Sequence, residues 1–445
     1  MRASPSRTVA APPSDEIRLL AEFREGSATF PHLLRPLRPY QARGALFAAC
    51  RGRVVLADEM GLGKSAQAIA AALLLARRAG VRRVLVLCPS GHVQGWMDEI
   101  AAVTDRPVGG PDDAIPEGDP SFRVAPLASA WRDRRLLAAS PPDLVVLDQA
   151  YRVARWEGRL GRGILALRSP YVIALTGVAS ECDPEWIHPL VRLLAPGALD
   201  ADDAHAARYL RLDDREAVAG VRHLDELRRR LATVALRRRA EEVSQELPGV
   251  IESIVPAADS VNPDPGGGAR SRLDALRRPA AAGRTAELHY LLRELVKANG
   301  HRVVVFAQDA DLVCAATPVC ERLKVGHACL WSRLSPAEER EVSRQFLLHP
   351  DLRVFVGTDD AIPEAVLAAT RHRICLDVPW SRAAFDRRGS GGPAPVHRIQ
   401  LLSRRPVESA LLAWHRSGAQ PDPAALLRAR PRELLARLLG RGARR

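Results

Sequence analysis

The pattern of apolar and polar positions divides the chain into two stretches in which strands alternate with helices. In each stretch the strand-like segments are almost continuously apolar instead of alternating. Such strands are typical of parallel sheets covered by helices on both faces. We expect strands at 53–58, 82–89, 142–148 and 171–177, and then at 301–308, 327–331, 352–358, 372–379 and 396–403.

A segment rich in proline, glycine and alanine separates the two stretches. Its part VNPDPGGG can be neither a helix nor a central strand. The sequence therefore predicts an α/β protein of two lobes, each a mainly parallel sheet flanked by helices, with a cleft between them where a ligand would bind. The expected parts are an N-terminal extension with a helix (1–34), a first lobe (35–255), a linker (256–284), a second lobe (285–415) and a basic helical tail (416–445).

Composition narrows the class of protein. With 445 residues, 47% of them apolar, the chain is long enough for two or three domains. We see no apolar run near the roughly 18 residues that cross a membrane, and no signal-peptide core at the N-terminus. A cytoplasmic protein without a membrane partner is expected. The seven cysteines lack metal-binding spacing, so we expect buried thiols.

Charge points to a polyanionic partner. The formal net charge of +13 suits DNA or RNA, although a GC-rich genome that inflates arginine codons would raise it as well. The chain has only three lysines, Lys64, Lys297 and Lys324. A lysine at position 64 of such an arginine-rich chain indicates that this position requires one.

That lysine lies in the segment DEMGLGKS, residues 58–65, between an expected strand and an expected helix. A bound triphosphate needs backbone N–H groups aimed at its oxygens, a cation, and a hydroxyl for Mg²⁺. Gly61 and Gly63 permit the close approach, Lys64 would reach the β- and γ-phosphates, and Ser65 would ligate Mg²⁺. We therefore predict a phosphate-binding loop for ATP and Mg²⁺, with Asp58 in place of the first glycine of the general pattern.

The full string DEMGLGKS resembles the form found in the Swi/Snf-type ATPases, a branch of the superfamily-two helicases. The resemblance runs in order from about residue 37 to 411. It is carried by LRPYQ (37–41), CPSGHVQGWMDEI (88–100), DQAY (148–151), LTGVAS (175–180), LVRLLAPG (190–197), ALRRRAEEVSQELP (235–248), VVVFAQ (303–308), SPAEEREVSRQF (335–346) and LDVPW (376–380).

The resemblance implies two RecA-like lobes, a DNA-directed ATPase or translocase, and double-stranded DNA as the partner. We expect targeting to come from a partner protein, the basic tail or the N-terminal helix. It implies that Gln41 contacts the base edge, that Thr176 and Gly177 couple the lobes, and that Asp148 helps Ser65 to hold Mg²⁺. The implied nucleotide-binding residues are Arg38, Gln41, Asp58, Glu59, Met60, Gly61, Leu62, Gly63, Lys64 and Ser65, and the implied catalytic residues are Lys64, Asp148, Gln149 and Arg388.

The chain departs from the family where the chemistry occurs. Gln149 stands where the family has a glutamate, and an amide can orient a water molecule but cannot accept its proton. In some GTPases a glutamine suffices when an arginine finger helps. Here Arg388 corresponds to the first of two family arginines, and Gly391 stands at the second. The segment 358–367 lacks the family's arginine and glycines and brings in Asp359 and Asp360.

Two hypotheses of different class follow. In the first, the chain is a Swi/Snf-like DNA-directed ATPase that grips duplex DNA. In the second, it is a catalytically weak or inactive regulatory or scaffold protein that uses ATP to close its lobes. The intact loop at 58–65 fits both hypotheses, whereas Gln149 and Gly391 favour the second.

Overall fold

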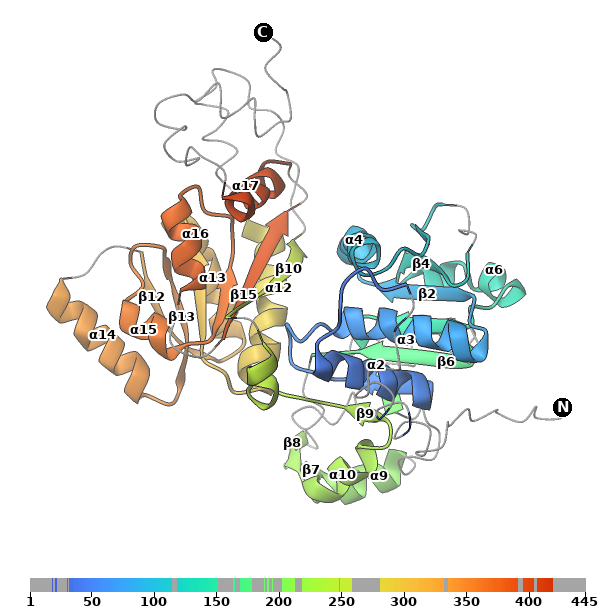
Figure 1. Cartoon of the computed structure of the whole chain (residues 1–445). Helices are drawn as coiled ribbons and strands as arrows, with labels where there is room; N and C mark the ends of the chain where they lie inside the picture. The colour runs from blue at the N-terminus through green and yellow to red at the C-terminus, as the bar shows by residue number, and fades with distance from the viewer. Residues whose placement is uncertain are drawn as a thin grey trace, which may run out of the picture. The chain divides into compact units, whose positions relative to one another are not determined.

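The structure is a computed structural model of the chain. It describes residues 18, 21, 30, 32–113, 118–150, 163–164, 169–177, 188, 190–191, 194, 202–212, 218–247, 249–257, 281–331, 335–390, 395–403 and 406–418. The chain divides into two compact units, Met1–Glu246 and Leu247–Arg445, each of which is built on its own sheet (Figure 1).

The first unit contains a seven-stranded sheet in the order β3-β4-β2-β5-β6-β1-β9, and every pair in it is parallel. Helices α2 (Pro39–Arg51) and α3 (Lys64–Ala79) pack against each other beside this sheet (Figure 1). The strands are β1 (Arg53–Leu56), β2 (Arg83–Cys88), β3 (Val108–Gly109), β4 (Ser121–Pro126), β5 (Leu144–Leu147), β6 (Tyr171–Leu175) and β9 (Ala235–Leu236).

Other elements of this unit surround the sheet. Helix α4 contacts α3 and β4, and the hairpin of β7 and β8 forms a small antiparallel sheet of its own. The remaining described elements of the first unit are η1 (Ser90–His92), α4 (Val93–Val103), α5 (Ser129–Arg132), α6 (Arg134–Ala139), α9 (Asp202–Tyr209), β7 (Leu210–Leu212), β8 (Val218–Val221), α10 (Leu224–Leu231) and η3 (Glu241–Glu246).

Helix α3 is the centre of the core of this unit. Ten consecutive residues from Ala66 to Leu75 are buried, which an α-helix achieves only when it is covered on all sides. Its alanines let α2 and the strands approach closely. The helix ends at Gly80, whose left-handed φ of 67° is the conformation favoured after a helix C-terminus, as the sequence predicts.

The second unit contains a six-stranded parallel sheet in the order β10-β15-β14-β11-β13-β12. Its helices alternate with the strands along the chain (Figure 1). The elements are β10 (Val250–Ala257), α12 (Ala281–Leu292), η4 (Arg293–Ala298), β11 (Val303–Ala307), α13 (Ala310–Arg322), β12 (Gly326–Leu330), α14 (Pro336–Leu348), β13 (Leu352–Thr358), α15 (Glu364–Ala369), β14 (His372–Cys375), α16 (Arg382–Gly389), β15 (Val396–Ser403) and α17 (Pro406–Ser417).

The predicted fold class is confirmed, and the boundary between the two lobes needs a correction. The sequence placed the end of the first lobe at residue 255, but β10 pairs with β15 in the second sheet, so the division falls after Glu246. An edge strand tolerates Pro256 because one of its sides makes no ladder hydrogen bonds. The expected linker 256–284 is also too long, because α12 begins at Ala281; its residues 258–280 lie outside the described part.

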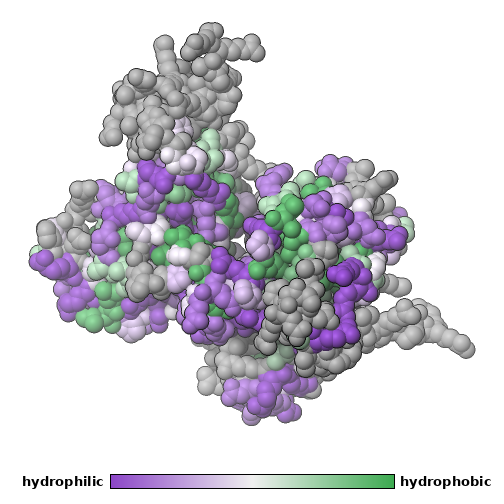
Figure 2. Space-filling model, viewed as in Figure 1, coloured by the Kyte–Doolittle hydropathy of each residue, from purple (hydrophilic) through white to green (hydrophobic). Residues whose placement is uncertain are grey.

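Two other expectations fall mainly outside the described residues, namely the helix of the N-terminal extension (1–34) and the basic helical tail (416–445). Cys50, Cys88, Cys320 and Cys375 are buried, as expected, whereas Cys314 is exposed. Hydrophilic residues cover much of the visible described surface in each unit (Figure 2). Among the described helices, none is long and apolar enough to cross a membrane.

Candidate functional site: a phosphate-binding loop in the first unit

Strand order brings the predicted site residues of the first unit to one edge. Strands β1, β6 and β5 are neighbours and run parallel, so their carboxyl ends meet. The loop 58–63 follows β1, Thr176 follows β6, and Asp148 follows β5. The backbone N–H of Thr176 donates to the carbonyl of Leu56 over 3.1 Å, and the Thr176 residue is buried next to the start of the loop. This edge is where open α/β sheets bind ligands.

The loop already has the backbone shape that a phosphate requires. Gly61 and Gly63 have left-handed φ values of 88° and 70°, which L side chains rarely adopt. Helix α3 begins at Lys64, so the N–H groups of its first turn point toward the loop. The Lys64 Nζ donates to the carbonyls of Asp58 over 2.8 Å and of Glu59 over 3.3 Å. The Lys64 side chain therefore lies over the loop at which a phosphate would bind.

Gln41 lies directly against this loop. Its Nε2 donates to the Leu62 carbonyl over 3.4 Å, and its Oε1 accepts from the backbone N–H of Arg38 over 3.1 Å. A Cβ added to Gly63 would lie only 2.4 Å from the Gln41 Nε2. The guanidinium of Arg38 donates to the Glu246 carbonyl, at the end of the unit. Helix α2 is thus joined to the loop through one amide side chain.

The two acidic side chains of the loop are turned away from Lys64. Asp58 is wholly buried and receives two hydrogen bonds from the Arg238 guanidinium, one from Nε over 3.0 Å and one from Nη2. Gln67 also donates to Asp58, over 3.0 Å. The Oε2 of Glu59 accepts from the backbone N–H of Ala240 over 2.7 Å. The Lys64 ammonium therefore contacts the backbone carbonyls of these two residues.

Asp148 is held by residues that follow β2. Its Oδ2 accepts from the Trp96 Nε1 over 2.9 Å and lies 3.7 Å from the His92 Nδ1, and its Oδ1 accepts from the Gln149 backbone N–H over 2.8 Å. Burial by itself would raise the pKa of Asp148, but His92, Trp96 and the Gln149 N–H outweigh it and lower the pKa. The carboxylate is therefore ionised at neutral pH, the form that a Mg²⁺ ligand needs.

Gln149 has an unusual backbone. Its φ is 50°, in the left-handed region where non-glycine residues are uncommon, and its side chain is largely buried. Residues in such conformations persist where surrounding contacts fix them, and they cluster at functional sites. Here the Asp148 carboxylate receives the Gln149 N–H, which fixes the turn that follows β5.

The donors gathered at this edge fit a magnesium nucleotide. Gly61 and Gly63 take left-handed φ values, a Cβ on Gly63 would meet the Gln41 amide, and the lysine supplies a cation. Ser65, half-buried in the first turn of α3, supplies a hydroxyl, and the ionised Asp148 supplies an oxygen ligand. Met60 and Leu62 complete the loop backbone, and Gly177 follows Thr176 at the end of β6.

Arg388, the remaining predicted catalytic residue, belongs to the second unit. Its side chain is 1% exposed and makes ion pairs with Asp359 and Asp377. The structure therefore gathers the predicted residues of the first unit at one edge and places Arg388 in a buried cluster of the other unit.

Sequence reasoning missed three residues that hold the site together, namely Arg238, Trp96 and His92. Trp96 and Arg238 lie in segments that carry the family resemblance, but a sequence gives no sign that they reach Asp148 and Asp58. His92 lies three residues after Pro89 and has no local pattern of its own.

Comparison with known proteins agrees with this geometry. Residues 40–108, which include α2, the loop and α3, match the SNF2-related domain. The solved core of the SWI2/SNF2 ATPase from Sulfolobus solfataricus in complex with dsDNA is 20% identical, with a TM-score of 0.71, and covers 92% of this chain and 98% of that one. A second solved structure, the SWI2/SNF2 ATPase core domain from Sulfolobus solfataricus, is 19% identical with a TM-score of 0.72. The match covers 90% of this chain and 94% of that one.

Curated relatives are longer proteins. The chain is 27% identical over 241 residues to zebrafish (Danio rerio) chromodomain-helicase-DNA-binding protein 1-like, covering 49% of this chain and 23% of that protein. It is 22% identical over 386 residues to human DNA annealing helicase and endonuclease ZRANB3, covering 77% of this chain and 36% of that protein. The chain thus spans between 23% and 36% of the length of these two relatives.

The resemblance to the Swi/Snf-type, helicase-like ATPases is therefore confirmed. Residues 40–108 match the SNF2-related domain, and the chain has the two-lobed, RecA-like α/β fold of the Swi2/Snf2 ATPase core.

Proposed function

We propose that this protein is a Swi/Snf-like, DNA-directed ATPase that binds ATP with Mg²⁺ at loop 58–65 and acts on duplex DNA. The observation that carries the proposal is the preformed loop, in which Gly61 and Gly63 take left-handed φ values and the Lys64 Nζ is folded over the loop carbonyls. Its location within the SNF2-related segment supports ATP as the nucleotide.

In this proposal the residues have separate roles. The backbone N–H groups of 59–65 and the Lys64 ammonium bind the phosphates, and Gln41 with Arg38 contacts the base. Ser65 and Asp148 hold Mg²⁺, which would neutralise phosphate charge and orient the γ-phosphate. Gln149 orients the attacking water, and Thr176 with Gly177 transmits the state of the nucleotide.

The proposed hydrolysis is slow because the side chain at position 149 is the amide of Gln149. General-base help is typically worth roughly 10²- to 10⁴-fold, and an amide cannot supply it. Some GTPases work with a glutamine in this role, provided that an arginine stabilises the transferring phosphate. We assign that second role to Arg388 of the second unit.

Duplex DNA is the proposed partner because the chain has a formal net charge of +13 and because one similar solved core is described in complex with dsDNA. Positive side chains that release counterions from phosphates give binding that weakens with salt. The alternative, a regulatory protein that binds ATP without turnover, is not favoured by the relatives. A cytoplasmic location and a targeting protein partner remain predictions of the sequence.

The proposal is tested by the rate of ATP hydrolysis with duplex DNA, single-stranded DNA or RNA added. Lys64→Ala is the blank, and Lys297→Ala, which alters an exposed lysine of η4 in the second unit, is the matched control. We expect hydrolysis that duplex DNA stimulates, that Lys64→Ala abolishes and that Lys297→Ala leaves unchanged. ATP binding without Lys64-dependent hydrolysis on any nucleic acid would favour the regulatory alternative.

A further inference from the structure

A buried arginine fills the ligand-binding edge of the second sheet. Strands β14, β11 and β13 are neighbours and parallel, so their carboxyl ends meet. Asp377 lies just beyond β14, and Asp359 follows β13 directly. Helix α16 inserts Arg388 between these two carboxylates. The edge at which an open α/β sheet binds ligands is thus occupied by the chain's own charged side chains.

The donors of Arg388 are almost fully used. Its Nε donates to the Asp359 Oδ1 over 2.6 Å, and its Nη2 donates to the Asp359 Oδ2 over 2.7 Å and to the Asp377 Oδ1 over 2.9 Å. Its Nη1 donates to the Asp377 carbonyl. A guanidinium has five N–H donors, so four of them are engaged within this cluster.

The cluster is buried and charged. Burial would lower the pKa of the Arg388 guanidinium, but Asp359 and Asp377 raise it well above its ordinary value. The ring of Phe306 lies 5.5 Å from the guanidinium carbon. Since two carboxylates face one guanidinium, the cluster presents no net positive charge to a phosphate. The adjacent Arg387 is engaged as well, with Glu364 at 3.1 Å and with the Ile362 carbonyl.

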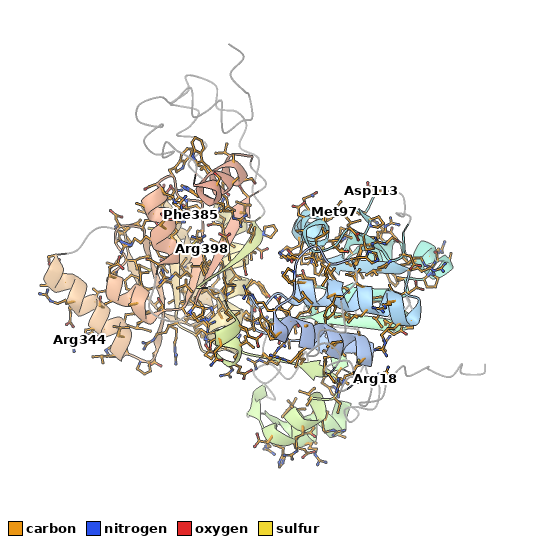
Figure 3. All side chains as sticks on the ribbon, in the orientation of Figure 1. Arg18, Met97, Asp113, Arg344, Phe385 and Arg398 are labelled. Atoms are coloured by element: carbon orange, nitrogen blue, oxygen red, sulfur yellow. The ribbon has the colours of Figure 1, made fainter. Side chains whose placement is uncertain are left out.

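The backbone of α16 is anchored on other sides. The buried Arg373 donates to the Arg387 carbonyl over 3.1 Å, at the end of the helix. The Arg398 Nη1 donates to the Phe385 carbonyl over 3.0 Å, and its guanidinium carbon lies 4.0 Å from the Phe385 ring centre (Figure 3). These contacts hold the backbone of α16 in place. If Arg388 exchanged one hydrogen-bond partner for another, only the Arg388 side chain would need to move.

The two carboxylates are not equivalent. Asp377 is 2% exposed, and its Oδ2 also accepts the backbone N–H of Gln308 over 2.9 Å, which makes it part of the sheet edge. Asp359 is 18% exposed and binds the Nε and Nη2 of Arg388 as a bidentate pair. A phosphate binds an arginine in the same bidentate geometry. Asp359 therefore occupies the position on Arg388 that a nucleotide phosphate would need.

We propose that Asp359 is a positioning residue that holds Arg388 away from the nucleotide, and that Arg388 exchanges Asp359 for a phosphate oxygen before hydrolysis. This inference rests on the proposed function, because it needs Arg388 to act on ATP. It gives Asp359, which lies in the segment that replaces the family's arginine and glycines, a restraining role in the second unit.

The test compares DNA-stimulated hydrolysis by Asp359→Asn with that of the unmodified protein. Asparagine keeps the shape of the side chain and removes the charge that competes with phosphate. We expect a gain on the order of tenfold, a small part of the roughly 10³-fold and more that an engaged arginine contributes. The control is Asp360→Asn, which removes the charge of the next residue, bonded to the Thr358 hydroxyl over 3.0 Å. It should show no gain.

Two further measurements show whether any gain runs through Arg388. The double variant Asp359→Asn with Arg388→Gln should lose the gain, and Asp359→Glu should restore the restraint. Labelling with phenylglyoxal, read by peptide mass spectrometry, should leave Arg388 unmodified in the unmodified protein and modify it in Asp359→Asn. Arg344, 58% exposed on α14, is the reactive reference (Figure 3).

An unchanged rate in a folded Asp359→Asn, or a gain that survives Arg388→Gln, would overturn the inference. If Asp359→Asn does not fold, Asp359→Ser decides by the same measurement. A gain of about tenfold that Arg388→Gln removes would support the inference, whereas an unchanged rate would overturn it. Failure of the proposed function is seen separately, as the absence of Lys64-dependent hydrolysis in every variant.

Discussion

Asp58 and Arg238, which are 180 residues apart in the sequence, form a bidentate ion pair beneath the phosphate-binding loop. The same guanidinium donates to the Tyr40 carbonyl and to the Gln67 Oε1, so one side chain joins α2, the loop, α3 and the segment after β9. A Cβ on Gly44 would lie 1.8 Å from that Gln67 oxygen, so the glycine makes room for the network. The pair would let an aspartate lie beside a bound triphosphate, because the Arg238 guanidinium neutralises the charge of Asp58.

Arg238→Ala should destabilise the protein strongly. It leaves the carboxylate of Asp58, which is wholly buried, without its cation, a change that typically costs about 3–5 kcal/mol. Urea unfolding followed by circular dichroism measures the loss. The neighbouring Arg239 is exposed, and Arg239→Ala should change stability by less than about 0.5 kcal/mol. Equal effects of the two substitutions would contradict the role assigned to the pair.

Gly63→Ala should weaken ATP binding more than Gly80→Ala does. Both glycines have left-handed φ values and flank the same helix, α3, so both substitutions carry about 1 kcal/mol of backbone strain. Only at Gly63 does the new Cβ meet another side chain, at 2.4 Å from the Gln41 Nε2, while Gly80 has open space. Titration with a fluorescent ATP analogue measures the difference. Comparable affinity in the two variants would contradict the place given to Gly63 in the nucleotide-binding loop.

Trp96→Phe should weaken the response to Mg²⁺. The ring remains to pack, but Asp148 loses the N–H that reaches its Oδ2 over 2.9 Å. Loss of a group that orients a metal ligand typically costs roughly 10- to 100-fold in metal affinity or activity. Mg²⁺ titration of nucleotide binding measures it. Trp331→Phe, at a residue of the second unit that is 54% exposed, serves as the control and should behave like the unmodified protein.

Gln149→Glu should increase the rate of DNA-stimulated hydrolysis. A carboxylate at this position can accept a proton from water, which is typically worth roughly 10²-fold or more. Steady-state kinetics give kcat, and Gln149→Ala is the control that removes the amide without adding a base. If glutamate brings no gain over glutamine, proton transfer at this position is not what limits the rate.

The sequence predicted the strands and the loop because their signals are local. Apolar runs mark nine of the strands, and the loop motif is contiguous. The short β9 and the polar β4, which has Arg123 in its centre, lack such runs and were missed. Most residues of β10 were placed in the first lobe because its partner β15 lies 146 residues further along the chain, as the pair Val250 and Val396 shows.

Side-chain partners were not predictable in the same way. Asp359 looked like a misplaced negative charge near a phosphate site, and only the fold shows that it pairs with Arg388. Asp58 looked like a nucleotide contact, but its carboxylate faces Arg238 instead. Such contacts depend on which strand ends become neighbours, and the linear sequence does not contain that information.

The most direct test of the account is the rate of ATP hydrolysis by the unmodified protein, measured without DNA and with saturating duplex DNA. We predict a slow basal rate that duplex DNA raises and that Lys64→Ala removes under both conditions. A rate that duplex DNA leaves unchanged, or one that survives Lys64→Ala, would contradict the account.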